Sequence, residues 1–174
     1  MQKHLAVALF LCVSSISMAA QGFPQAEVFA GYEYTRQSAI EGFTSSQNGW
    51  NVAVTGNVNK TLGITGDFSG VYKSTYGILF QGYSYTFGPV ANLNHEGKIN
   101  PFAHALFGRS HFILSGNGTG TSNSFTMMLG GGADVKINER FAYRLVQADW
   151  VYQHFSGSDL KKDVRLSTGI VVRF

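Results

Sequence analysis

The strongest constraint on the fold is a recurring pattern of segments, each roughly ten residues long, in which apolar and polar side chains alternate. Turn-forming residues separate the segments. A tilted strand of about 9–11 residues crosses a bilayer, and a closed, even-stranded sheet leaves no unpaired edge in lipid. The pattern therefore predicts an all-β, eight-stranded antiparallel up-and-down transmembrane β-barrel. Its eight segments are residues 27–36, 50–57, 62–72, 76–88, 101–112, 125–137, 141–155 and 164–174.

Composition agrees with a membrane barrel and excludes two other classes. Glycine supplies 21 of 174 residues, about 12%, where roughly 7% is average, and charged residues reach only 13%. Mean hydropathy is +0.00, so apolar and polar residues are finely mixed. Beyond the first twenty residues, no apolar run approaches the ~18 residues of a membrane helix. A helical membrane protein is excluded, and an ordinary soluble enzyme is disfavoured.

Residues 1–20 have the features of a cleaved secretory signal peptide, which indicates export. Lys3 and His4 precede an apolar stretch, and small residues lead to a cut after Ala19 or Ala20. Cleavage removes the single cysteine, Cys12, so no disulfide framework is expected. It also leaves 12 basic and 10 acidic residues, and this charge of 12 − 10 = +2 argues against nucleic acid as a partner. We expect two regions: 1–20 as the signal peptide and 26–174 as the barrel domain.

The next question is which face of each strand meets lipid. A soluble lipocalin-like barrel has an apolar interior, whereas a membrane barrel has an apolar outside with aromatic girdles at both rims. We expect the membrane arrangement, with a soluble sandwich as the alternative. The expected far girdle is Tyr34, Trp50, Tyr72, Tyr76, Phe112, Phe125, Tyr152 and Phe155. The expected girdle at the terminal rim is Phe87, Phe102, Phe141 and Phe174.

The opposite faces carry ionisable residues, which we expect to form a charge network inside the barrel, because buried charges need partners. Lys136 and Arg173 share these faces. Asp134 and Arg144 flank a tight turn and can pair across it. Keeping Gln147 inward as well requires a β-bulge near Leu145–Val146. The expected network is Glu33, Asp67, Asp134, Arg144, Asp149 and Arg165.

Connections differ in predicted length. We expect tight turns near residues 59–60 and 138–140, and longer polar extracellular loops at 37–49, 113–124 and 156–163. The first two of these loops are candidate contacts for an extracellular ligand. The connection at 89–100 is unexpectedly long for the terminal side. In segment 101–112, Arg109 and His111 share parity with Phe107, which indicates either a bulge or a position above the bilayer.

The last residues, R-L-S-T-G-I-V-V-R-F, resemble the terminal β-signal of bacterial outer-membrane barrels, through Ser167, Gly169, Val172 and Phe174. With G-G-G-A-D at 130–134 and R-L-V-Q-A-D-W at 144–150, the chain resembles the OmpA-like outer-membrane β-barrel (porin) family over roughly 26–174. The resemblance implies insertion by the barrel-assembly machinery and an outer-membrane monomer with periplasmic termini. It also implies contact with lipid and lipopolysaccharide, and a structural or interaction role with at most a narrow passive pore. No residues follow Phe174, so a peptidoglycan-binding domain is not expected.

A catalytic role is the alternative that the sequence offers. His154 and Ser156 share a strand face, which resembles the His-x-Ser of lipid A deacylases, where histidine serves as general base. The outward residues expected on the next strand, Val164, Leu166, Thr168 and Ile170, include no acid, which leaves Asp159 and Asp163 as loop candidates. Histidines 95, 104, 111 and 154 lack ligand spacing for a metal. The sequence therefore predicts a non-enzyme without cofactor or metal, with a lipid A deacylase as the alternative.

Overall fold

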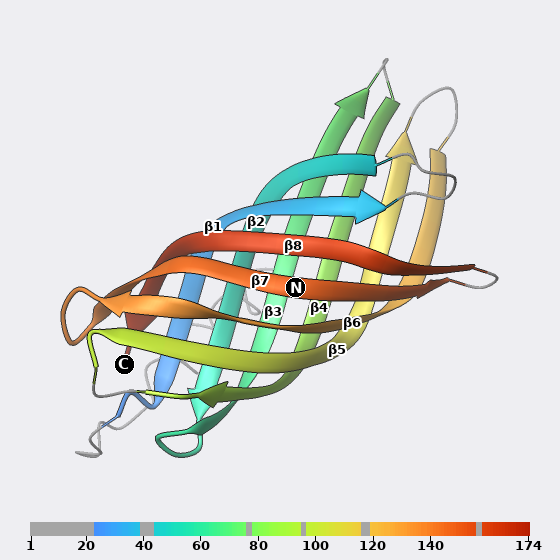
Figure 1. Cartoon of the computed structure of the whole chain (residues 1–174). Coiled ribbons are helices and arrows are strands. Elements are labelled where there is room, and N and C mark those ends of the chain that lie inside the picture. The colour runs from blue at the N-terminus through green and yellow to red at the C-terminus, as the bar shows by residue number, and fades with distance from the viewer. Residues whose placement is uncertain (1–22, 39–43, 76–77, 95–96, 116–118, 156–157) are drawn as a thin grey trace, which may run out of the picture.

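A computed structural model describes residues 23–38, 44–75, 78–94, 97–115, 119–155 and 158–174. These residues form a closed barrel in which each strand pairs with its neighbours in the chain, and β1 pairs with β8 (Figure 1). Every pairing is antiparallel. Among these residues, no helix is long and apolar enough to cross a membrane. The strands are β1 (Ala26–Ser38), β2 (Thr44–Asn57), β3 (Leu62–Thr75), β4 (Ile78–Asn92), β5 (Ile99–Ser115), β6 (Thr119–Lys136), β7 (Phe141–Phe155) and β8 (Ser158–Arg173).

The first and last strands close the cylinder. Their register runs from Glu27 opposite Arg173 to Arg36 opposite Val164. At the end of the chain, the Phe174 amide donates to the Ala26 carbonyl at 2.8 Å. The start of β1 and the end of β8 therefore lie at the same end of the barrel, the lower left in Figure 1. The predicted eight-stranded up-and-down barrel is confirmed.

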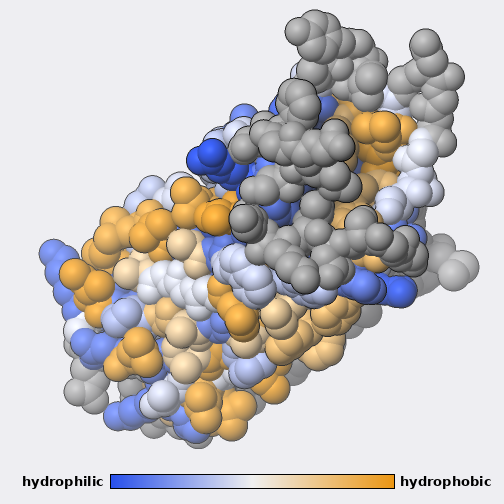
Figure 2. Space-filling view, turned by 45° about the vertical axis from the view of Figure 1, so that its right-hand side comes forward, coloured by the Kyte–Doolittle hydropathy of each residue, from blue (hydrophilic) through white to orange (hydrophobic). Residues whose placement is uncertain are grey.

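Side chains alternate between lipid-facing and lumen-facing positions. Outward apolar residues stay exposed, with Ile64 at 60% and Phe87 at 68%, whereas Asp67, Asp134 and Asp149 are buried at 3% or less. Figure 2 shows apolar residues spread over the side of the barrel. This arrangement is the reverse of a soluble barrel and confirms the predicted orientation of the two faces.

All the strands except β7, which has its predicted bounds of Phe141–Phe155, are longer than predicted. They span 13 to 18 residues, and the expected loops at 37–49 and 113–124 are largely paired strand. Ser38 lies opposite Thr44, and Ser115 lies opposite Thr119; residues 39–43 and 116–118 fall outside the described part. The polar composition of these two stretches predicted solvent-exposed loops. In an antiparallel hairpin, however, the backbone N–H and C=O groups hydrogen-bond to the partner strand, whether the hairpin lies in lipid or in water. Similarly, β8 starts at Ser158, within the expected loop 156–163, and the expected connection at 89–100 shortens to 93–98.

Local irregularities follow the sequence closely. The β7–β8 register shifts between Arg144 and Gln147, which confirms the bulge near Leu145–Val146 and turns both flanking side chains inward. Segment 101–112 contains no shift in its pairing with β6, so Arg109 and His111 simply face outward. The tight turns at 58–61 and 137–140 are confirmed. In each, an asparagine side chain, Asn59 or Asn138, accepts two backbone amides at 2.8–2.9 Å.

The predicted aromatic girdles are correct only in part. Trp50, Tyr72 and Phe125 are exposed on the outside, and Trp50 Nε1 donates to the Tyr72 hydroxyl at 3.2 Å. The prediction was wrong for three other members, which face the lumen. Side chains point inward at the even-numbered positions of β5 and, beyond the bulge, at the odd-numbered positions of β7. Phe102 is buried in the lumen, and Phe112 and Phe155 line its far mouth. Tyr76 lies outside the described residues.

Candidate functional site

The centre of the lumen is occupied by Arg165, which projects inward from β8 and is 1% exposed. It donates two hydrogen bonds to Asp67 on β3, at 2.7 and 3.1 Å, and one from Nε to Asp149 on β7, at 2.8 Å. Glu33 on β1 lies 3.6 Å from its Nη1. Two-point guanidinium–carboxylate pairing is the geometry in which a buried arginine is best compensated.

A second arginine continues the network toward the terminal end. Arg144 donates to both Asp134 oxygens at 2.8 and 3.1 Å, and from Nη1 to Gln147 Oε1 at 2.7 Å. Gln147 in turn donates to Asp149 at 2.8 Å. The six residues expected inside therefore all lie in the lumen and within one chain of contacts. The predicted pair of Asp134 and Arg144 across the turn is present.

Aromatic rings hold Arg144 from two sides. Its guanidinium carbon lies 4.4 Å from the centre of the Phe29 ring and 4.2 Å from that of Phe102. Cation–π contacts of this kind stabilise a desolvated cation by roughly 2 kcal/mol or more. Closer to the terminal end of the barrel, Arg173 Nε lies 3.5 Å from Glu27 Oε1. The lumen is thus filled with side chains at its terminal half, as expected of eight strands.

The sequence did not identify His104 as part of this network. Its Nε2 lies 2.6 Å from Asp149 Oδ1, and both side chains are buried. Its parity with the lumen-facing Leu106 on β5 was the available signal, but the mixed polarity of that strand obscured the inward face. Lys136, by contrast, does not join the network: it forms a 2.7 Å pair with Glu139 in the adjoining turn.

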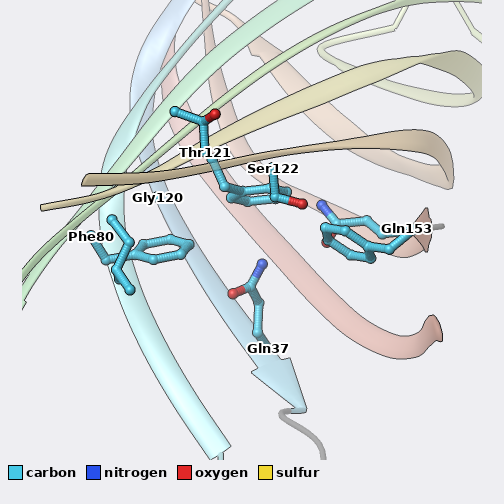
Figure 3. Close-up of a pocket in the computed structure, with 9 residues that line it drawn as sticks. Gln37, Phe80, Gly120, Thr121, Ser122 and Gln153 are labelled. Atoms are coloured by element: carbon cyan, nitrogen blue, oxygen red, sulfur yellow. The ribbon is translucent and has the colours of Figure 1, made fainter. Parts of the chain in front are cut away.

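The far mouth of the barrel holds a pocket of about 380 Å³ (Figure 3). Three phenylalanine rings and two glutamine amides face it from four different strands, β1, β4, β5 and β7. Between this pocket and Arg165, the described residues line a space of about 30 Å³, enough for a water molecule or two. The pocket is therefore a cup closed from below. Its lining residues are Gln37, Phe80, Phe112, Leu114, Gly120, Thr121, Ser122, Gln153 and Phe155.

Two glycines of β6, Gly130 and Gly132, lie next to the ion network. A Cβ on Gly130 would collide with the Ala148 carbonyl and with Asp149, and one on Gly132 would collide with the Val146 carbonyl. Both contacts are backbone contacts with β7. Close approach of these two strands therefore depends on the absence of side chains.

The candidate catalytic and assembly residues are divided between the outer surface and the lumen. His154 is exposed, and the register places Asp159 opposite it; Ser156 lies outside the described residues, and Asp163 is buried. In the described part of the chain, no group of three or more His, Cys, Asp or Glu side chains is placed to hold a metal. The proposed assembly signal comprises the buried Ser167, the half-buried Gly169 and Val172, and the exposed Phe174.

Solved structures share this architecture. Neisserial surface protein A matches with a TM-score of 0.70 and 14% identity, over 88% of this chain and all of that one. Ail, the attachment invasion locus protein of Yersinia pestis, matches with a TM-score of 0.64 and 19% identity, over 87% and 99% of the two chains. The N-terminal β-barrel domain of Pseudomonas aeruginosa OprF gives 0.59 and 11%, over 87% and 99%. No protein-family profile and no curated protein matches the chain by sequence. The structural likeness shows a shared fold, that of small outer-membrane eight-stranded barrels.

Proposed function

We propose, from the fold that this chain shares with the OmpA-like outer-membrane β-barrels, that it is an integral outer-membrane protein with a structural and surface-contact role. The observation that carries this proposal is the filled lumen. Because Arg165 is bonded to Asp67 and Asp149 across the middle of the barrel, the interior offers no wide path for solutes. The surfaces left for function are the lipid-facing band and the far end.

Orientation follows from the ends of the barrel. The turns centred on Asn59 and Asn138 are short and lie at the end where β1 begins and β8 finishes. Outer-membrane barrels have short periplasmic turns and longer extracellular connections. We therefore place both termini of the barrel in the periplasm, after removal of residues 1–20 by the export machinery.

The proposed partners during assembly and afterwards are those of the membrane itself. The outward apolar band contacts lipid and, in the outer leaflet, lipopolysaccharide. Ser167, Gly169, Val172 and Phe174 form the signal through which the barrel-assembly machinery receives β8 before it pairs with β1. Closure through β1 and β8 leaves no strand edge for another subunit, which supports a monomer.

Surface contact is assigned to the far ends of the strands. Residues 37–49 and 113–124 include the ends of β1 and β2 and of β5 and β6, which rise at the far end of the barrel in Figure 1. Ail is described as an attachment protein, and it has been solved with a heparin analogue, sucrose octasulfate. A barrel that presents polar hairpin ends to the outside is suited to the same kind of contact.

The proposal is tested in the bacterium that produces the chain. Deleting the gene is expected to increase detergent sensitivity or to reduce attachment to surfaces, and the wild-type gene restores the phenotype. The protein is expected in the outer-membrane fraction, with an electrophoretic mobility that changes on boiling. Unchanged attachment and unchanged detergent sensitivity after deletion would contradict the role.

Planar-bilayer recording of the purified barrel distinguishes a narrow passive pore from the structural role. The filled lumen predicts no discrete conductance steps. Regular steps that respond to replacement of Arg165 by a smaller residue would assign solute passage to the lumen and overturn the structural role as the main one.

A lipid A deacylase is the second candidate, favoured by one observation. The β7–β8 register brings Asp159 opposite His154, so an acidic residue is present on the next strand after all. His154→Ala and Ser156→Ala, expressed beside the wild type, are compared by mass spectrometry of lipid A. Release of a fatty acid by the wild type alone would establish the enzyme; identical lipid A in all strains and in the deletion strain would exclude it.

A further inference from the structure

The cup at the far mouth is lined in a way that an ordinary solvent-filled rim is not. Phe80, Phe112 and Phe155 form a continuous aromatic wall, with ring centres 5.6 and 5.8 Å apart between neighbours. They come from β4, β5 and β7 and all turn into the lumen, where they face a space of about 380 Å³. We propose that this cup is a binding site for a small, neutral aromatic molecule that carries a hydroxyl or N–H donor, such as a phenol or an indole.

The volume and the walls argue for an aromatic ligand. Small-molecule sites are concave, mostly apolar cavities of about 300–1,000 Å³ with a few placed polar groups. Aromatic rings prefer offset or edge-to-face neighbours with centres about 4.5–7 Å apart. An inserted ring can meet Phe112 in that geometry, and Leu114 completes the apolar side of the cup.

The polar side of the cup argues for a donor on the ligand. Gln153 is 5% exposed, and its Oε1 accepts no hydrogen bond from any described residue, while its Nε2 lies 3.5 Å from Ser110 Oγ. Gln47, whose Nε2 donates at 2.8 Å to the Gln37 of the lining, is 3% exposed, and its Oε1 also accepts no hydrogen bond from any described residue. A buried amide oxygen without a partner is unfavourable, so an O–H or N–H from a ligand at Gln153 satisfies it.

Charge sets the ligand class. None of the described residues that line the cup has an ionisable side chain, and Arg165, deeper in the lumen, is already paired with Asp67 and Asp149. A charged ligand would lose hydration without gaining a partner. The cup therefore favours a neutral molecule, and because the lumen narrows beneath it, the molecule is held rather than passed.

The test uses the whole barrel, reconstituted in lipid nanodiscs, and the fluorescence of 2-naphthol, with 2-methoxynaphthalene as the matched compound without a donor. Saturable binding is expected, about tenfold tighter for 2-naphthol than for its methyl ether. Gln153→Leu is expected to remove that preference. Phe112→Ala is expected to weaken both compounds. Matched controls are Gln81→Leu and Phe107→Ala, which alter outward side chains of β4 and β5 and are expected to bind as the wild type does.

A second measurement needs no variant. In the wild-type barrel, 2-naphthol is expected to shift the NMR signals of Phe80, Phe112 and the Gln153 side-chain amide and to leave Phe107 unmoved. Each variant is first checked for the mobility change on boiling that marks a closed barrel. Non-saturable uptake equal in all variants, or shifts confined to outward residues, would show lipid partitioning only and overturn the site.

Discussion

Arg165 and Asp67 form a two-point ion pair across the lumen although 98 residues separate them in the chain. Strands β8 and β3 are not neighbours, because β1 and β2 lie between them. The pair therefore exists only after the sheet has closed. It links closure of the cylinder to the filling of its interior.

Replacing Arg165 with Met leaves Asp67 and Asp149 buried without their shared cation. The free energy of unfolding is expected to fall by about 3–5 kcal/mol, the cost of breaking a buried ion pair from one side. Urea unfolding of the barrel in phosphatidylcholine vesicles measures it. The control, Arg109→Met, changes an exposed outward arginine and is expected to stay within about 0.5 kcal/mol. Equal effects of the two substitutions would contradict a central ion network.

The contact of β6 with β7 is tested at a glycine. Gly130→Ala places a Cβ against the Ala148 carbonyl and Asp149, and is expected to destabilise the barrel by about 1–3 kcal/mol. Gly56→Ala on β2 is the control, because its Cβ would meet nothing within 4 Å. The midpoint temperature of the mobility change measures both. If the Gly130→Ala barrel is as stable as the Gly56→Ala barrel, β6 and β7 do not approach each other so closely.

The lipid-facing band is tested by moving a charge along it. Phe68 lies midway along β3 and faces outward, 51% exposed, whereas Val58 lies in the turn that precedes this strand. Arginine at a bilayer midplane costs about 2–4 kcal/mol and near the interface about 0–1. Phe68→Arg is therefore expected to destabilise the barrel much more than Val58→Arg. Urea unfolding of the two variants in lipid vesicles measures the difference. The reverse order would contradict the placement of the band.

The proposed assembly signal is tested at its last residue. Phe174→Ser is expected to reduce the amount of folded barrel in the outer membrane, while stability of the protein that does fold changes little. Phe141→Ser, at another exposed phenylalanine near the same rim, serves as the control. Quantitative blotting of unboiled membrane samples measures the folded fraction. Equal losses for both variants would assign the effect to lipid contact rather than to recognition of the last strand.

Strand number and the inward charges followed from the sequence because both depend on a local rule, the alternation of side chains along a strand. Asp67 and Arg165 stand out as charges among outward apolar neighbours, so their side of the sheet is decided by their own segments. The bulge at Leu145–Val146 was predictable because Arg144 and Asp149 have opposite parity, and both were expected inside.

The positions of three phenylalanines were not predictable by the same rule. Phe102, Phe112 and Phe155 are apolar but face inward, because a narrow lumen also needs bulky side chains around Arg144 and at the mouth. The lengths of the hairpins were missed for a different reason. Pairing of Ser115 with Thr119 depends on the partner strand rather than on composition, so a Gly/Ser/Thr-rich stretch does not distinguish a loop from an exposed strand.

The central claim, that the apolar faces of the strands meet lipid, is tested most directly by the two native tryptophans. Trp50 and Trp150 both lie on the outside of the barrel, 41% and 39% exposed. In vesicles whose acyl chains carry bromine close to the headgroup, their fluorescence is expected to be strongly quenched, and aqueous iodide is expected to quench it weakly. Strong quenching by iodide with no effect of the brominated lipid would show that these faces meet water, and would contradict a membrane-spanning barrel.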